Sequence, residues 1–220
     1  MGSSPLPDSR LTRLQHDVLE AFFEREDRFF LTGGAALAGF HLRHRSSEDL
    51  DLFVLAPNAL GEAEQVLGAA TGVCGATMRS VRRFPEHLRF LVERGEEKTV
   101  VDLVLDRAPQ IEPEKSRIGR IRIDSMREIA ANKICTLLGR SEPKDLVDLK
   151  AILDSGVSLE QALRDAETKD AGASAANLAF VLGQWRIGPK AVLPGDADPV
   201  EVERFREQLV AQLARLAFPG

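Results

Sequence analysis

Asp49 and Asp51 are the most informative pair of residues, because they lie at the start of an apolar, strand-like run that extends to Leu55. Carboxylates at positions i and i+2 of a strand project from the same face, roughly 7 Å apart along the backbone. In such an apolar setting, ionised carboxylates are costly unless a cation or hydrogen bonds compensate them. We therefore predict that both aspartates bind one or two divalent cations. The alternative is a pair of solvent-facing acids at the start of a strand.

A third carboxylate is predicted to complete this metal site. Asp102 lies inside the apolar run Thr99–Leu105, and the period of two places Asp106 on the same face. Three aspartates from two neighbouring strands can hold two Mg²⁺ ions about 3.5–4 Å apart. Asp106 is the competing third ligand, but it follows the strand, where a solvated turn acid is a simpler explanation. We therefore favour Asp102.

The glycine pair Gly33-Gly34 lies between a short apolar run and an alanine-rich segment, which indicates a strand-to-helix turn. Backbone N–H groups at such a turn can bind the β- and γ-phosphates of a nucleotide, and Thr32 can add a hydroxyl. The alternative is a tight turn that binds nothing. Together with the aspartates, the turn indicates metal-dependent chemistry on a nucleoside triphosphate.

The elements that must position these residues follow from hydrophobic periodicity and turn signals. The predicted fold class is α+β: a mixed sheet with flanking helices over residues 1–120, followed by an α-helical half over residues 121–220. Asp8 or Ser9 is the expected N-cap of the first helix. We expect strands at 29–32, 50–55, 73–83, 88–94, 99–105 and 120–123, and helices at 9–26, 34–43, 58–70, 125–139, 143–154, 158–169, 174–187 and 198–217.

Composition excludes several classes of protein. The 220 residues carry a net charge of -5, which does not fit a polybasic nucleic-acid coat, and the only two cysteines argue against a disulfide framework. No apolar run approaches the length of a membrane span, and the start MGSSPLPDSR has no secretion signal. We therefore expect a cytoplasmic protein with no membrane partner.

Two motifs carry a family resemblance. The first is Thr-Gly-Gly-Ala-Ala-Leu from Thr32, followed by His-Arg-x-Ser-x-Asp-x-Asp-Leu-Phe from His44. The second contains Ala-Asn-Lys ending at Lys133, Leu-Leu-x-Arg ending at Arg140, and Pro-Lys-Asp-Leu-x-Asp-Leu from Pro143. Over roughly residues 29 to 153, the chain resembles the AbiEii/AbiGii toxin family of nucleotidyltransferases, within the DNA polymerase beta-like superfamily.

The resemblance implies a role for each matched position. Gly33 and Gly34 would lie beside the incoming nucleotide. The metal ligands would be Asp49 and Asp51, with Asp102 as the third acid. Lys133 would contact the nucleotide phosphates and is counted with the three aspartates as catalytic. The predicted nucleotide-binding residues are Thr32, Gly33, Gly34, Arg45, Ser47, Lys133 and Asp145.

The second motif also has a purely structural interpretation. Lys133 and Arg140 share one face of a predicted helix, and Asp145 and Asp148 share one face of the next. An ion-pair network between the two helices would stabilise the helical half. Both interpretations can hold at once, because such a network can also orient Lys133.

The predicted function is Mg²⁺-dependent transfer of a nucleoside monophosphate from a nucleoside triphosphate to an acceptor hydroxyl. The resemblance implies the toxin of a toxin–antitoxin system, with a cognate antitoxin and an RNA such as tRNA as partners. Alternatives are transfer to a small molecule or a protein hydroxyl, and a non-catalytic nucleotide-binding regulatory module. Basic residues that could bind RNA phosphates lie in two groups, Arg79, Arg82, Arg83, Arg89, Arg94 and Lys98, and Lys115, Arg117, Arg120 and Arg122.

Overall fold

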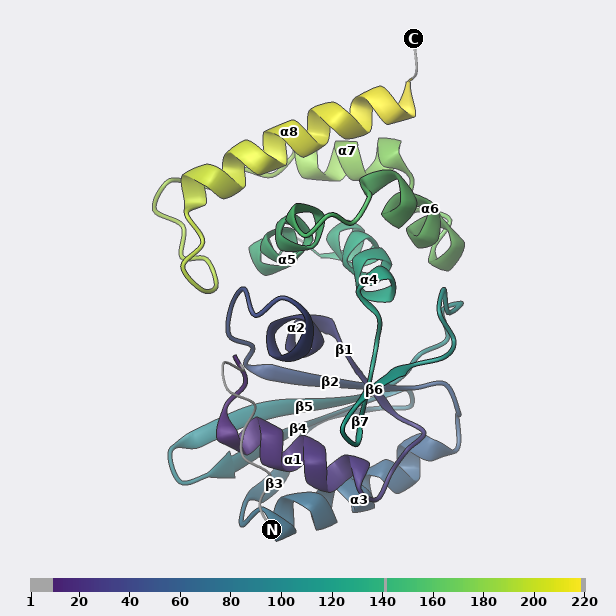
Figure 1. Ribbon diagram of the computed structural model, residues 1–220, viewed down its shortest axis with the longest axis vertical. Helices are drawn as coiled ribbons and strands as arrows, with labels where there is room; N and C mark the ends of the chain where they lie inside the picture. The colour runs from purple at the N-terminus through teal and green to yellow at the C-terminus, as the bar shows by residue number, and fades with distance from the viewer. Residues whose placement is uncertain (1–9, 141, 219–220) are drawn as a thin grey trace. The chain divides into compact units, whose positions relative to one another are not determined.

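The computed structural model describes residues 10–140 and 142–218, and these form two compact units (Figure 1). The first unit comprises the chain up to Arg107 together with Glu114–Ser125. The second comprises Ala108–Pro113 and the chain from Met126 onward. All strands of the sheet belong to the first unit, whereas the second unit has helices.

The first unit is built on a mixed sheet of seven strands, in the order β3-β4-β5-β2-β1-β7-β6. The pairs β2–β5 and β1–β7 are parallel, and the other neighbouring pairs are antiparallel. The predicted α+β class is confirmed. The strands are β1 (Phe30–Thr32), β2 (Asp49–Val54), β3 (Thr77–Phe84), β4 (His87–Arg94), β5 (Glu97–Leu105), β6 (Ser116–Ile118) and β7 (Ile121–Ile123).

The helices α1 (Arg13–Phe23) and α3 (Ala59–Val73) lie on the same side of this sheet (Figure 1). The side chain of Gln15, on α1, donates a hydrogen bond of 3.1 Å to the hydroxyl of Thr99 on β5, which shows which face α1 covers. Strand alternation then places Leu50 and Leu52 on the covered face, where both are fully buried. The aspartates of β2 therefore belong to the opposite face.

The first helix begins later than predicted. Its N-cap is Thr12, whose side chain accepts from the Gln15 backbone N–H in a capping box, so the expected cap at Asp8 or Ser9 is wrong. Asp8 and Ser9 themselves lie outside the described residues. The helix ends at Phe23 instead of residue 26.

The segment after the glycine pair was predicted as one helix over 34–43, but its helical geometry changes along its length. A short α-helix, α2 (Gly33–Ala36), continues into a π-helix, η1 (Leu37–His41), in which the backbone N–H of Leu42 donates to the Leu37 carbonyl at 2.8 Å. A Cβ at Gly39 would lie 2.7 Å from a methyl carbon of Leu11, so the backbone here passes too close to Leu11 for any side chain.

Two strand predictions needed correction. The third strand begins at Thr77 instead of residue 73, because α3 continues to Val73. The segment 107–124 was predicted as a loop with a single strand, but it contains the hairpin β6–β7. The turn of this hairpin places Gly119 at a φ of 60°, a conformation that glycine adopts without strain.

The second unit consists of packed helices: α4 (Met126–Gly139), α5 (Pro143–Asp154), α6 (Leu159–Lys169), α7 (Ala175–Gly183) and α8 (Pro199–Ala217). Ser158, Ser174 and Asp198 cap α6, α7 and α8 with their side chains. Helix α7 ends at Gly183, four residues before the predicted end at 187. Within the described residues, no helix has the length and apolar character needed to cross a membrane.

Candidate active site

A row of four polar residues crosses four neighbouring strands of the first unit. Asp51 on β2 is the register partner of both Thr32 on β1 and Asp102 on β5. Asp102 is in turn the partner of Arg89 on β4. Because register partners in neighbouring strands project from the same face, these side chains line one face of the sheet.

Asp49 and Asp51 belong to this face through the alternation of β2. Their neighbours Leu50 and Leu52 are buried against the other face, whereas both aspartates are half-buried. The apolar positions thus set the register of the strand, and the register sets the direction of both carboxylates. The structure therefore places Asp49, Asp51 and Asp102 on one face, as the sequence predicted.

The glycine pair packs directly on one predicted metal ligand and on two of the predicted nucleotide-binding residues. A Cβ on Gly33 would overlap the Asp51 carboxylate, and a Cβ on Gly34 would lie 2.6 Å from a terminal guanidinium nitrogen of Arg45. The Ser47 hydroxyl, also beside Gly34, donates to the Asp49 carbonyl at 3.2 Å. The turn is thus tight because its backbone approaches a carboxylate and a guanidinium.

The hydroxyl of Thr32 is an unusual feature at this turn. Thr32 is buried, and within residues 10–140 and 142–218 its Oγ1 has no hydrogen-bond partner. Thr32 stands at the N-cap position of α2 without using its side chain as a cap. A buried hydroxyl without a partner costs free energy, which is consistent with a group that binds a ligand.

Asp102 is held by two side chains of β4. Arg89 donates from Nε to Oδ1 at 2.8 Å and from Nη2 to Oδ2 at 2.7 Å. His87 Nε2 lies 2.6 Å from Oδ1. Burial by itself raises the pKa of the Asp102 carboxyl, but the hydrogen bonds from Arg89 and His87 outweigh burial and bring the pKa below its ordinary value. The carboxylate is therefore ionised at neutral pH.

His87 and Arg89 are the residues of this site that sequence reasoning missed. The signal that could have found them is the hairpin between β4 and β5. In this hairpin Arg94 pairs with Glu97 across a turn that contains Gly95 at a φ of 59°. Counting outward from this two-residue turn pairs Arg89 with Asp102. Arg89 was predicted only as one member of a basic surface, so its pairing with an acid changes its interpretation.

The donor set fits a divalent cation in part. Asp49 and Asp51 provide oxygen ligands of the kind that Mg²⁺ prefers, on one half-buried face. The Asp102 carboxylate is less available to a metal ion, because both of its oxygens already accept hydrogen bonds from side chains of β4. Across the part of the chain that the structure describes, no three His, Cys, Asp or Glu side chains are grouped as metal ligands.

The second motif forms a buried ion-pair cluster inside the helical unit. Lys133 Nζ on α4 lies 2.7 Å from both Asp145 Oδ1 and Asp148 Oδ2 on α5. Arg140 Nε donates to Asp145 Oδ2 at 2.9 Å. Lys133 is only 6% exposed, and both aspartates are fully buried. The predicted ion-pair network between these helices is present.

The charges in this cluster stabilise one another. Burial lowers the pKa of Lys133, but the charges of Asp148 and Asp145 outweigh it and raise that pKa. Burial raises the pKa of Asp145, but Lys133 and Arg140 outweigh it and lower that pKa. Lys133 and Asp145 are therefore both charged at neutral pH, and the charge of each stabilises the charge of the other.

Comparison with solved structures identifies the class of fold. The chain resembles MenT4, a nucleotidyltransferase toxin from Mycobacterium tuberculosis, with 16% identity and a TM-score of 0.61 over 91% of this chain and 81% of that chain. It also resembles JHP933 from Helicobacter pylori, with 21% identity and a TM-score of 0.54 over 93% and 92%. A comparison with curated proteins finds no match.

The family is shown by the sequence profile of the AbiEii nucleotidyl transferase toxins of type IV toxin–antitoxin systems, which matches residues 17–218. This match covers most of the chain and includes both motifs. The protein belongs to the AbiEii toxin family and is a nucleotidyltransferase.

We expect Gly33→Ala to lower the free energy of unfolding by about 1–3 kcal/mol, because the new methyl would meet Asp51 and because alanine is strained at a φ of 65°. Urea unfolding of the purified variant measures this. Gly61→Ala, in α3 with open space around it, is the matched control and should stabilise the helix by about 0.5–1 kcal/mol. Equal stability of Gly33→Ala and wild type would contradict the close approach.

Proposed function

We propose that this nucleotidyltransferase transfers a nucleoside monophosphate from a nucleoside triphosphate to a hydroxyl of an RNA such as tRNA, with release of pyrophosphate and with Mg²⁺ as its metal. The observation that carries the proposal is the placement of Asp49, Asp51 and the Gly33-Gly34 turn around one face of the sheet. We further propose that the protein acts in the cytoplasm and that a cognate antitoxin restrains it.

In this proposal, Asp49 and Asp51 hold the metal ion, which when bound would neutralise charge on the phosphates and activate the acceptor hydroxyl. Because Gly33 and Gly34 have no side chains, the backbone of the turn lies directly beside Asp51 and Arg45, and its N–H groups are the proposed partners of phosphate oxygens. The guanidinium of Arg45 is suited to pair with a phosphate, as arginine often does. Thr32 and Ser47 contribute hydroxyls at the same turn. The role of Lys133 in phosphate binding stays a prediction.

The basic residues of the sheet offer fewer free charges for RNA than the sequence indicated. Arg83 pairs with Glu64 at 2.8 Å, Arg94 pairs with Asp17 at 2.6 Å, and Arg89 pairs with Asp102. Arg79 and Arg82 are exposed on the edge strand β3. Lys98 is also exposed, on β5, and we propose that the phosphate contacts centre on the two arginines because they lie together on the edge strand.

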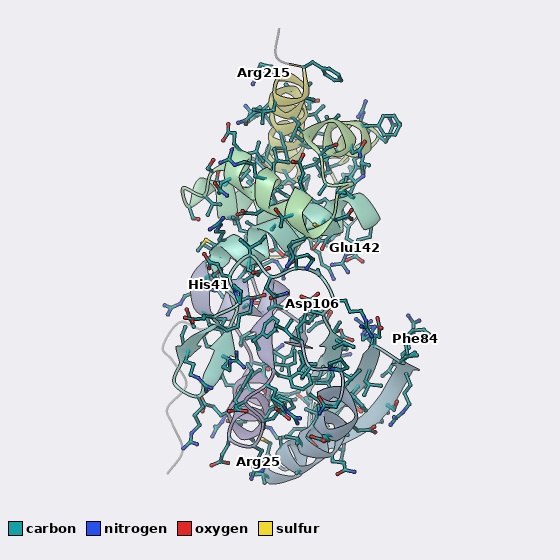
Figure 2. The ribbon with its side chains drawn as sticks, turned by 90° about the vertical axis from the view of Figure 1, so that its right-hand side faces the viewer. Arg25, His41, Phe84, Asp106, Glu142 and Arg215 are labelled. Atoms are coloured by element: carbon teal, nitrogen blue, oxygen red, sulfur yellow. The ribbon has the colours of Figure 1, made fainter. Side chains whose placement is uncertain are left out.

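The end of the same strand presents an aromatic side chain. Phe84 is 54% exposed and projects away from the rest of its unit (Figure 2), and the Arg82 guanidinium lies 5.7 Å from the centre of its ring. An exposed aromatic ring beside guanidinium groups is suited to stack an unpaired base next to the phosphates that the arginines bind. We propose β3 as the strand that contacts the acceptor RNA.

Incubation with each of the four labelled nucleoside triphosphates, Mg²⁺ and total cellular RNA tests this function directly. We expect label on a tRNA-sized band after gel separation, and no label with Asp51→Asn. Label on the protein itself, on a small molecule, or on nothing would contradict transfer to RNA and would point to one of the alternative acceptors.

The RNA contact is tested by measuring RNA binding at several salt concentrations for the double variant Arg79→Gln/Arg82→Gln. Loss of two phosphate contacts should make the salt dependence of RNA binding, as log K against log salt, less steep by about two. Arg204→Gln, which removes an exposed charge from α8, is the control and should keep the wild-type slope. An unchanged slope in the double variant would exclude β3 as the RNA contact.

A further inference from the structure

The acidic face of the sheet contains a cation of its own. Arg89 lies in the same row as Asp51 and Asp102, and it binds Asp102 through two hydrogen bonds of 2.8 and 2.7 Å. Such a bidentate pair is planar and directional, so it fixes both the position and the orientation of the carboxylate. His87 adds a third contact to the same group at 2.6 Å.

These contacts leave little of Asp102 for a metal ion. Oδ1 accepts from both Arg89 and His87, which uses its two lone pairs, and the residue is only 3% exposed. A metal ion on Oδ2 would stand beside the Arg89 Nη2 atom that already donates to this oxygen. The two positive charges would repel each other in a half-buried setting where screening by water is weak.

The electrostatic setting keeps Arg89 charged and in place. Its hydrogen bonds to Asp102 raise its pKa most, and the charges of Asp49 and Asp51 raise it further. Arg89 therefore interacts with all three carboxylates while it contacts one. A guanidinium in this position partly compensates the negative charge that the three aspartates bring together.

We propose that Arg89 is a positioning residue that withholds Asp102 from metal coordination, so that Asp49 and Asp51 alone bind the divalent cation. This inference rests on the proposed function, because it concerns the metal of that reaction. The sequence predicted that Asp102 is the third metal ligand, and this inference gives Asp102 a different role. Asp102 fixes a positive charge beside the metal-binding pair.

Mn²⁺ titration of the full chain, with free Mn²⁺ followed by electron paramagnetic resonance, tests this role without any reaction. We expect wild type to bind one Mn²⁺ and Asp51→Asn to lose this binding. The charge-balanced variant Arg89→Gln/Asp102→Asn should keep the wild-type affinity within about threefold, because it removes a closed pair. Arg89→Gln alone should bind Mn²⁺ at least about tenfold more tightly, because Asp102 becomes available as a ligand.

Arg89→Gln leaves the buried Asp102 carboxylate without its guanidinium partner and could fail to fold for this reason. The double variant decides the inference even in that case. A loss of about tenfold or more in Mn²⁺ affinity in the double variant would show that Asp102 is a ligand and would overturn the role of Arg89. Unchanged Mn²⁺ affinity in a folded Arg89→Gln would overturn this role as well.

Absence of Mn²⁺ binding by wild type and Arg89→Gln alike would overturn both this inference and the metal dependence of the proposed function. If the wild-type protein binds Mn²⁺ but transfers no nucleotide to RNA, the proposed function alone is overturned.

Discussion

Replacement of Asp51 by asparagine is expected to reduce nucleotidyl transfer by about 10³-fold, at the upper end of the range for a residue that stabilises charge in a transition state. Asparagine keeps the shape of the side chain and removes its charge, so the packing of the Gly33 turn against it is preserved. Since β2 is set by its buried apolar residues, the fold should survive. Incorporation of labelled nucleotide by the variant and wild type, with circular dichroism of both, measures this.

Asp106→Asn is the matched control for this measurement. Asp106 follows the end of β5, where its backbone N–H donates to the Val54 carbonyl at 2.8 Å, a bond that the substitution does not touch. We expect its transfer rate to stay within about twofold of wild type. A wild-type rate in folded Asp51→Asn would refute the role of this carboxylate, and a loss confined to Asp106→Asn would favour the competing ligand.

Replacement of Lys133 by methionine is expected to lower the free energy of unfolding by about 3–5 kcal/mol. The substitution removes the ammonium group that lies 2.7 Å from each of two fully buried carboxylates, and it leaves Asp148 and Asp145 facing each other. Removing one partner of a buried ion pair costs this much because the remaining charge is no longer compensated. Urea unfolding at neutral pH gives the value.

Two further measurements separate this electrostatic cause from lost packing. Lys133→Met/Asp148→Asn also removes one of the opposing charges and should recover part of the loss. The folded-state pKa of Asp145 is lowered, so its contribution to stability is present above its unfolded pKa and is lost as the pH falls through the folded value. The difference between wild type and Lys133→Met should therefore narrow toward acid pH. A difference that stays constant with pH would contradict the charge argument.

Much of the fold was predictable because its elements are marked locally. The alternation of charged and apolar residues in β2 and β5 predicted both strands and the face on which their acids lie. Strand β6 escaped prediction because its three residues are all exposed and give periodicity nothing to register, whereas its partner β7 was predicted. The π-helix η1 also went unpredicted, because nothing in the composition of residues 37–41 marks a change of helical geometry.

The candidate site was predictable to a different degree in its two parts. Residue types and spacing named the acids and the glycines, because metal and phosphate chemistry restricts which residues can serve. The partners of Asp102 were not named, since a pair such as Arg89 and Asp102 depends on the register of a hairpin, which has to be counted from its turn. The buried contacts of Lys133 were foreseen as one of two interpretations, because its charged neighbours lie at helical spacing.

The β4–β5 hairpin also implies an order of events during synthesis of the chain. Asp102 finds Arg89 and His87 within its own hairpin, whereas Asp51 precedes α3 and reaches Asp102 only by closing a long loop. Local pairings form sooner than those that close long loops. We therefore expect the hairpin to neutralise Asp102 before it docks beside β2, which removes a like-charge repulsion from the docking step. A nascent chain that lacks this hairpin cannot assemble the acidic row, so the toxin fold acquires its carboxylates together only after β5 has left the ribosome.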